Sequence, residues 1–356
     1  MRICLIASSR FPVREPFHGG MEAHTASLAE QLIRRGHTVR VFAAPGSDER
    51  LHVEELAVQP FESSEAARQD VGAMPETWMR EHHAYLGLMM DLARTGPERF
   101  DVVHNNSLHH LPVAMAGMVD LPIVSTLHTP PVPWLESALA LSRGDTRFVA
   151  VSRHTAQAWA HVVDTDVVLN GIDTDRWAFG RGGDRAVWTG RLVPEKAPHL
   201  AVRAAVAAGI AIDLAGPRPD PGYWSREIEP LLGPDVRYVG HLGTDELVRL
   251  VGGAAVAVVS PVWDEPYGLV AAEAMSCGTP VAAFRRGALP ELVTPTTGAL
   301  ARPDDVDSLA AAIRRALWRS RPVVRRHAVQ HLGVGRMVSA YEDLYAHVRD
   351  RHRFAA

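Results

Sequence analysis

Lysine is nearly absent from this chain of 356 residues, although it carries 37 basic side chains. Lys196 is the only lysine, and every other basic side chain is an arginine. A compact ammonium group on a flexible stem suits a crowded phosphate as a point charge, whereas the planar guanidinium group favours bidentate partners. Lys196 therefore either marks a phosphate site or is a chance survivor of arginine-rich codon usage, and its surroundings must decide.

Arg191 precedes Lys196 by five positions in a segment that follows a short apolar run. The segment reads Gly190-Arg191-Leu192-Val193-Pro194-Glu195-Lys196. We expect it to form a loop between a strand and a helix, from which both cations reach one diphosphate. Two cations can stabilise the charge that develops on a departing nucleotide without help from a metal ion. The alternative for Arg191 is an ordinary surface charge.

The most specific pattern lies in residues 263–280, where Glu265 and Glu273 are eight positions apart. Pro266 and Gly268 interrupt the chain between a predicted strand and a predicted helix. Glu265 then falls on the loop and Glu273 about one turn into the helix, so both can face one ligand across the helix N-terminus. Carboxylates accept paired hydrogen bonds from sugar or ribose hydroxyls. The backbone N–H groups expected to meet phosphate oxygens are those near Gly268, Leu269 and Val270. A capped helix with an incidental glutamate is the alternative, and the pattern is too elaborate for it.

Two features of the first half could also carry chemistry. Gly19 and Gly20 separate the first predicted strand from the first helix, where paired glycines let a ligand approach the backbone and the helix start. His128 ends the predicted strand 123–127, and functional groups gather at such carboxyl ends. An ordinary turn and a structural histidine are the respective alternatives. The pairs His82-His83 and His109-His110 lack the partner spacing of a metal site, so we interpret them as incidental.

Composition limits the class of protein. The length favours two domains, and 47% hydrophobic with 22% charged residues indicates a globular chain. A net charge of −4 argues against broad nucleic-acid binding. No apolar stretch reaches the roughly 18 residues of a membrane span, and the N-terminal segment is too short for a secretory signal, although contact with a membrane surface stays open. Cys4 and Cys277 lie in apolar surroundings without metal spacing, which favours a reducing cytoplasm.

Short apolar runs alternate with helical patterns along the whole chain, which predicts α/β units with parallel sheets. The predicted strands are 3–7, 38–43, 101–104, 123–127, 148–151, 167–169, 186–189, 211–214, 236–239, 255–259 and 281–283. The predicted helices include 21–35, 197–208, 244–251, 269–277, 306–318 and 334–348, and residues 61–95 read as helical excursions and loops. Turn formers at 170–173 and 180–184 place the linker there. We therefore expect an N-terminal domain over 1–170, a C-terminal domain over 171–335, and a last helix over 336–356 that crosses back.

These segments together resemble a known family over nearly the whole chain. The stretch from Glu265 to Glu273 resembles the E-x7-E signature of retaining glycosyltransferases of the GT-B fold, specifically glycosyltransferase family four. Residues 190–196 resemble its G-R-L-x-x-E-K motif, and Gly19-Gly20 resembles its glycine-rich first loop. Residues 170–173 resemble its N-G-[IV]-D linker, and 287–291 its G-G-x-P-E loop. The C-terminal half carries the specific part of the resemblance.

The resemblance implies a fold, a reaction and a role for each position. Two facing Rossmann-like, doubly wound parallel-sheet domains would hold the active site in the cleft between them. The reaction would move a hexose-type sugar from a nucleotide diphosphate sugar, UDP- or GDP-linked, with retention at the anomeric carbon. Arg191 and Lys196 would bind the diphosphate, Glu273 the ribose and Glu265 the transferred sugar. The remaining roles fall to Gly19 and Gly20 near the donor, His128 near the reacting sugar, His241 and Leu242 near the base, and backbone groups of Ala288 and Leu289 on sugar hydroxyls.

Two positions depart from the family pattern, at Ala197 and Ala288, where glycine is usual; neither departure removes a charged group. The chain has no convincing Asp-X-Asp cluster for a divalent ion. Residues 164–166 come nearest to one, but they read better as a turn. We therefore expect no metal and no other cofactor. Catalysis would be a front-face reaction in which the leaving diphosphate helps take the acceptor proton.

Other functions stay open on the sequence alone. They are a glycan phosphorylase or a nucleotide-sugar epimerase of the same fold, and a non-catalytic nucleotide-sugar binding protein. The acceptor is not identified; Trp78, Trp134 and Trp159 either line an acceptor surface or pack in the interior.

Overall fold

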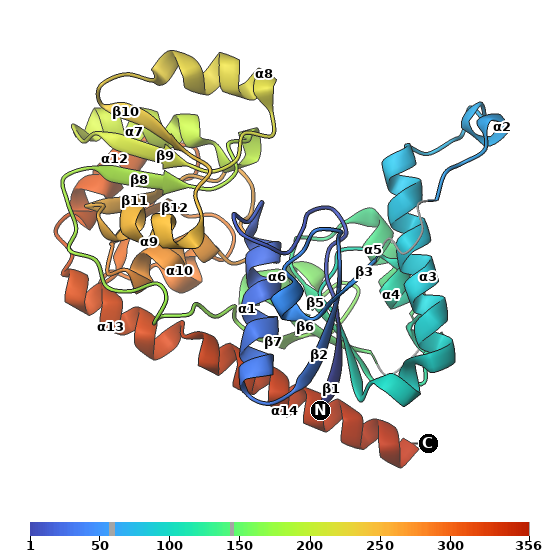
Figure 1. The fold of residues 1–356 in the computed structure, drawn as a ribbon. Helices are drawn as coiled ribbons and strands as arrows, with labels where there is room; N and C mark the ends of the chain where they lie inside the picture. The colour runs from blue at the N-terminus through green and yellow to red at the C-terminus, as the bar shows by residue number, and fades with distance from the viewer. Residues whose placement is uncertain (57–60, 143–145, 356) are drawn as a thin grey trace.

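Two parallel β-sheets, each covered by helices, organise the chain (Figure 1). The computed structural model describes residues 1–56, 61–142 and 146–355. Within these residues the first sheet has the order β3-β2-β1-β4-β5-β6-β7 and the second β10-β9-β8-β11-β12-β13, and all strand pairs given for them are parallel. The expected fold class of two doubly wound α/β domains is confirmed.

The strands of the first sheet are β1 (Arg2–Ile6), β2 (Thr38–Ala43), β3 (Val53–Glu55), β4 (Val102–Asn105), β5 (Ile123–Leu127), β6 (Arg147–Ala150) and β7 (Asp166–Val167). Its helices are α1 (Gly20–Arg34), α2 (Glu65–Arg68), α3 (Glu76–Arg99), α4 (Leu111–Ala114), α5 (Pro133–Leu141) and α6 (Arg153–Trp159). The stretch read as excursions and loops at 61–95 is therefore mostly one long helix, α3.

The strands of the second sheet are β8 (Ala186–Thr189), β9 (Ile212–Ala215), β10 (Val236–Gly240), β11 (Val256–Val259), β12 (Val281–Phe284) and β13 (Gly298–Ala301). The helices of this half are α7 (Pro198–Ala208), α8 (Pro221–Tyr223), α9 (Thr244–Gly252), α10 (Leu269–Ser276), α11 (Leu289–Leu292), α12 (Val306–Ala316), α13 (Arg321–His331) and α14 (Val334–Ala355). Of the residues that the structure describes, no helix combines the length and the apolar character that a membrane crossing requires.

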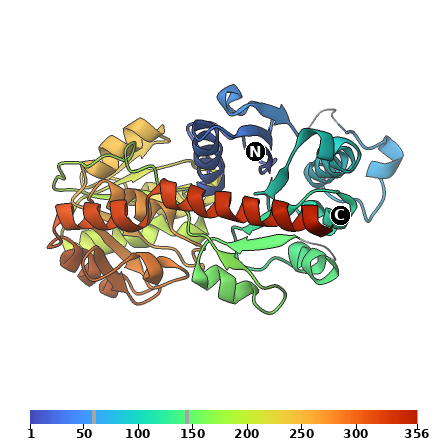
Figure 2. The ribbon, with the colours of Figure 1, turned by 90° about the horizontal axis from the view of Figure 1, so that it is seen from below.

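The last helix, α14, starts beside the second sheet and runs under the first (Figures 1 and 2). Tyr341 and Tyr345 are fully buried in the core of the first sheet. The Tyr345 hydroxyl lies 2.6 Å from Nδ1 of His104, and the Tyr341 hydroxyl 3.0 Å from Oγ1 of Thr126. The C-terminal segment thus completes the N-terminal core.

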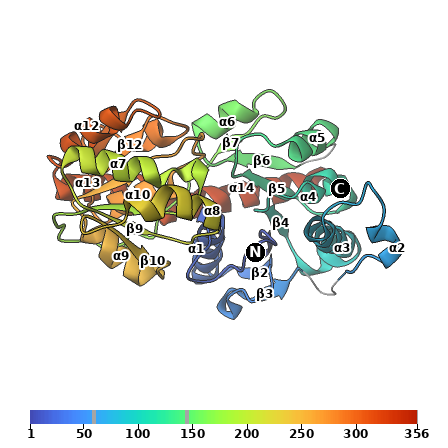
Figure 3. The same cartoon turned by 90° about the horizontal axis from the view of Figure 1, so that it is seen from above.

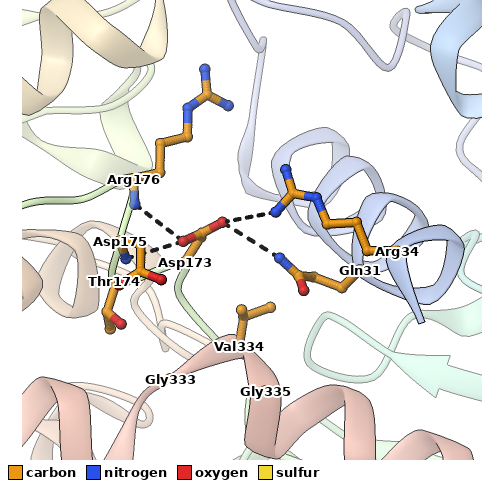
Figure 4. Close-up of a pocket in the computed structure, with 9 residues that line it drawn as sticks. All are labelled: Gln31, Arg34, Asp173, Thr174, Asp175, Arg176, Gly333, Val334 and Gly335. Atoms are coloured by element: carbon orange, nitrogen blue, oxygen red, sulfur yellow. Dashed lines mark hydrogen bonds and ion pairs between the residues drawn. The ribbon is translucent and has the colours of Figure 1, made fainter.

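The chain crosses between the two halves at two neighbouring segments, 170–176 and 332–335. Ile172 donates its N–H to the carbonyl of Leu332 (2.8 Å) and accepts from Val334 N–H (2.9 Å). Figure 4 shows the cavity of about 550 Å³ beside this crossing, where the Asp173 carboxylate accepts from Gln31 of α1 (3.4 Å). The crossing is thereby tied to α1, whose other end faces the second sheet.

Candidate functional site

Lys196 and Glu265 meet at the carboxyl edge of the second sheet. Lys196 ends a 3-10 turn (Pro194–Lys196) after β8, and Glu265 lies on the loop between β11 and α10. The Lys196 Nζ atom is 2.6 Å from Oε2 of Glu265 and 4.7 Å from the ring centre of Trp263. The indole N–H of Trp263 donates to the same carboxylate oxygen at 3.1 Å. The lone lysine is therefore held in a defined place by a carboxylate and an aromatic face.

Ala197, directly after the lysine, takes the backbone conformation that glycine favours, with φ of 45°. It is the N-cap of α7, which begins at Pro198, one residue later than predicted. The Ser260 hydroxyl donates to the Ala197 carbonyl at 3.0 Å. This hydrogen bond ties the turn to the end of β11, which Ser260 follows. Alanine at this position departs from the family pattern, but the turn still forms, because the Ala197 backbone adopts the left-handed conformation that glycine would adopt.

The N-terminus of α10 presents free donors beside Glu265. Gly268 is its N-cap with φ of 99°, a region where other residues are strained. In the hydrogen bonds of the described residues, the N–H groups of Gly268, Leu269 and Val270 donate to no protein group. Three unused N–H groups at a helix start can bind an anion, and their contact with phosphate oxygens stays a prediction.

The loop before α11 supports Glu265 from behind. The Ala288 N–H donates to the Glu265 carbonyl at 2.8 Å, and the Leu289 N–H donates to the Arg286 carbonyl at 3.2 Å. A Cβ on Gly287 would lie 2.2 Å from the Glu265 carbonyl oxygen, so this loop requires glycine there. Both N–H groups are engaged within the protein, and that of Ala288 fixes the backbone of Glu265; their contact with sugar hydroxyls stays a prediction.

Glu273 lies one turn into α10, where the sequence places it. Burial raises the pKa of its carboxyl from 4.5 to about 7, because the charged form loses hydration. The carboxyl makes no hydrogen bond to the residues that the structure describes. An unpaired carboxyl of this kind can accept hydroxyl groups from a ligand.

The first domain meets this site through its glycine loop and α1. A Cβ on Gly20 would lie 2.9 Å from Cδ1 of Leu269, so a larger residue would push the two helix starts apart. Glu22 is buried, which raises its pKa, and the nearby Arg191 charge opposes that rise. Arg191 itself lies 3.6 Å from Glu195. The Arg191 charge therefore acts on Glu22 of the first domain as well as on Glu195 of its own, and its contact with a diphosphate stays a prediction.

His241 contacts the same loop rather than the lysine. Its Nε2 atom lies 2.9 Å from the Phe17 carbonyl oxygen, and its ring is 5.7 Å from that of His18. Leu242 follows it after the end of β10, an edge strand of the second sheet. The structure joins His241 to the domain interface, and the base contact of both residues stays a prediction.

His128 lies deeper in the first domain. Its Nε2 atom bonds to the Asn106 side-chain oxygen, and its ring packs 4.9 Å from that of His24 on α1. Burial, with a smaller effect of His24 and His104, lowers the His128 pKa well below its usual value, so the ring is neutral at pH 7. Among the described residues it touches none of the other predicted site residues through a hydrogen bond or ring contact. Asn106 was not among the predicted site residues, although the polar run at the end of β4 could have indicated it.

Glu291, on α11, connects the second domain to the first. Its carboxylate accepts from the N–H groups of Arg153 (3.1 Å) and His154 (2.7 Å) at the start of α6. The Ser152 hydroxyl, which caps α6, also donates to the Pro266 carbonyl at 2.6 Å. A charged acceptor at a helix start satisfies unpaired donors and complements the dipole.

We expect Glu291→Ala to destabilise the protein by about 1 kcal/mol, since the α6 start loses its charged acceptor. We therefore expect a lower midpoint of thermal unfolding, which circular dichroism would measure. Glu227→Ala, at an exposed pair with Arg203, is the matched control and should leave the midpoint unchanged. An unchanged midpoint for Glu291→Ala would show that this contact between the domains contributes nothing to folding.

Comparison with known proteins gives matches over both halves of the chain. Residues 18–176 match the family described as Glycosyltransferase Family 4, and residues 183–318 match the family described as Glycosyl transferases group 1. The glycogen synthase of Mycobacterium tuberculosis is 30% identical, with 89% of this chain and 86% of the relative covered. The D-inositol 3-phosphate glycosyltransferase of Saccharomonospora viridis is 28% identical, with 93% and 89% covered.

Solved structures with the same fold cover almost the whole chain. HepE of Anabaena, in complex with UDP and glucose, has a TM-score of 0.75 at 19% identity, and 97% of this chain and 99% of HepE are covered. The sucrose-phosphate synthase of Thermosynechococcus elongatus has a TM-score of 0.77 at 21% identity, with 97% and 98% covered. At these identities the likeness establishes the architecture alone, the GT-B arrangement that the sequence resemblance implied.

Proposed function

Since the chain belongs to glycosyltransferase family 4, we propose that it moves a hexose-type sugar from a nucleotide diphosphate sugar to an acceptor with retention at the anomeric carbon. The observation that carries the proposal is the convergence of Lys196, Glu265 and the free donors of α10 at one sheet edge. A UDP- or GDP-linked donor is proposed, and the relative crystallised with UDP and glucose supports the first. The free, buried Cys4 and Cys277 support the expected reducing cytoplasm.

Binding of the donor would exchange one partner of the lysine. The ammonium group would leave the Glu265 carboxylate for the diphosphate, which also meets Arg191 and the α10 N–H groups. Glu265 is then free to accept hydrogen bonds from the sugar. Glu273 would accept those of the ribose, and the neutral His128 would contact the sugar without adding charge.

The reaction would then be a substitution on one face of the sugar. The bond between the anomeric carbon and the diphosphate oxygen breaks, with its electron pair going to that oxygen. The acceptor hydroxyl forms the new bond from the same face and passes its proton to the leaving oxygen. Lys196 and Arg191 stabilise the negative charge that develops there, so positioning and electrostatics supply the catalysis.

A donor screen followed by product analysis tests the proposal. Nucleotide diphosphate sugars are compared by thermal shift, because a bound ligand stabilises the protein by about 2.7 kcal/mol at a concentration 100 times Kd. The best donor is then used with an acceptor array in the presence of EDTA, and proton NMR gives the anomeric configuration of the product. We expect the product to keep the anomeric configuration of the donor sugar, and the rate with EDTA to equal the rate without it. An inverted product, a need for metal ions, or sugar release only with inorganic phosphate would each contradict the proposal.

A further inference from the structure

A group of stacked rings lies at the carboxyl edge of the first sheet, outside the donor site. We name it the ring cluster, and its members are Trp78, His82, His109, His110 and Trp134. His110 stacks between His109 (4.5 Å) and Trp134 (5.4 Å), and Trp78 lies 5.2 Å from His82 and 5.9 Å from Trp134. The rings come from α3, from the loop after β4 and from the start of α5, which lie beside one another in Figure 3. Three of the four histidines that the sequence left as incidental, His82, His109 and His110, therefore belong to one cluster.

The ring cluster has an open face, unlike a core. Trp134 is 58% exposed, and the other four rings are partly exposed. Trp159 makes the contrast clear, because it is fully buried and donates its indole N–H to the Thr129 carbonyl at 2.8 Å. Of the three tryptophans considered as acceptor residues, Trp159 is thus a packing residue, while Trp78 and Trp134 stay available to a ligand. Exposed aromatic rings gathered in this way are typical of recognition surfaces.

The cluster carries hydrogen-bonding groups but little charge. Burial, with smaller effects of His110 and His82, lowers the pKa of His109 to about 3, so its ring is neutral. Two arginines border the cluster, and both are paired: Arg10 with Glu81 (3.1 Å) and Arg80 with Glu76 (3.5 Å). In the described part of the chain, His82 Nδ1 is buried without a partner, and no group of three metal-ligating side chains is found. The surface therefore suits a neutral ligand with hydroxyl groups.

The cluster is attached to the loop that faces the donor site. Tyr85 stacks on His109 (4.3 Å), and its hydroxyl donates to the Ala7 carbonyl (2.9 Å) and accepts from Ser9 N–H (3.0 Å). Ala7 and Ser9 begin the connection from β1 to the glycine pair before α1. Strands β1, β4 and β5 are neighbours in the sheet, so their carboxyl ends form one continuous edge.

We propose that the ring cluster is the acceptor subsite and that it binds a neutral saccharide, with one pyranose ring stacked on Trp134 and Trp78. A pyranose has an apolar face of C–H groups and a rim of hydroxyls, which match aromatic faces and neutral imidazole nitrogens respectively. A phosphorylated acceptor fits less well, because the charge of each nearby arginine is balanced by a glutamate, Arg10 by Glu81 and Arg80 by Glu76. The inference rests on the proposed sugar transfer, since it assigns the acceptor of that reaction.

The test is direct binding, so that it does not depend on transfer. The full-length protein is applied to an array of neutral α- and β-linked gluco-, manno- and galacto-oligosaccharides, with sugar phosphates printed beside them. We expect binding to at least one neutral saccharide, weakened about tenfold or more by Trp134→Ala and less by Trp134→Phe, which keeps a ring. Trp318→Ala is the matched control, because Trp318 is 88% exposed on the other domain and should change nothing.

Donor binding separates this inference from the proposed function. The thermal shift given by the nucleotide should be equal in wild type, Trp134→Ala and Trp318→Ala. Binding to no neutral saccharide, binding to phosphates alone, or binding that Trp134→Ala leaves unchanged would each overturn the acceptor subsite. If saccharide binding depends on Trp134 but no donor sugar is ever transferred, the subsite stands and the proposed function fails.

Discussion

Replacing Lys196 by alanine should lower the turnover of sugar transfer by about 100- to 1,000-fold, the effect of removing one charge-stabilising donor from a transition state. The ammonium group is the only lysine charge in the chain, and it lies 2.6 Å from Glu265, on the loop that leads to the free N–H groups of α10. Its loss leaves the developing diphosphate charge to Arg191 and the backbone N–H groups. The measurement is kcat with a saturating donor and acceptor.

Lys196→Arg is the informative companion. It keeps the positive charge but replaces a compact group by a planar one in a space bounded by Trp263 and Glu265. We expect a loss of turnover close to that of alanine, with nucleotide binding better retained. Turnover near the wild-type value would mean that the lone lysine is an accident of codon usage. Thermal denaturation of both variants controls for folding, because Glu265 is left without its cation in the alanine variant.

The local order of strands and helices could be predicted well because both sheets are parallel and buried. Buried strands such as β11 (Val256–Val259) read as continuous apolar runs between helical patterns. The strands that the sequence did not predict, β3 and β13, lie at sheet edges. Two of the three residues of β3 are glutamates, and β13 begins with a glycine after a threonine-rich turn. An edge strand needs only one neighbour, so such sequences are tolerated there.

The candidate site could be predicted where its residues lie close together along the chain. Glu265 and Glu273 share one loop and helix, so their spacing was enough to place the first on the loop and the second one turn into α10. Contacts that join distant segments gave no such signal. The bond of His128 to Asn106 and the caps that Glu291 provides to α6 depend on how strands and domains come together. The ring cluster was missed for the same reason, since its members come from three separate elements.

Glu273→Gln should stabilise the protein without ligand at pH 8 and weaken its binding of nucleotide. Burial raises the pKa of Glu273 to about 7, whereas the unfolded chain has the ordinary value near 4.5. Below about pH 4.5 the carboxyl is neutral in both states, and its ionisation does not affect stability. As the pH rises from 4.5 to 7, the unfolded state loses the proton first, so the free energy of unfolding falls. Above pH 7 the total loss is about 3 kcal/mol, at 1.36 kcal/mol for each unit of pKa difference.

Glutamine cannot ionise, so the variant should not suffer this loss. We expect nearly equal thermal midpoints for the two proteins near pH 4, below the unfolded pKa, and a midpoint several degrees higher for the variant at pH 8. Glu227→Gln, at an exposed position, is the control for a change of net charge and should behave like the wild type at both values.

Nucleotide binding should change in the opposite direction. An ionised Glu273 accepts both hydrogen bonds of a ribose diol, so wild-type affinity should rise as the pH passes through 7. The glutamine variant should bind about tenfold more weakly at pH 8, with no such pH dependence, as measured by calorimetry with the nucleotide diphosphate of the best donor. A residue that lowers the stability of the empty protein and raises its affinity for nucleotide is placed for binding. The prediction is contradicted if the glutamine variant is less stable than the wild type at pH 8 and binds nucleotide as tightly. Glu273 would then have a structural role in the core and no role in binding.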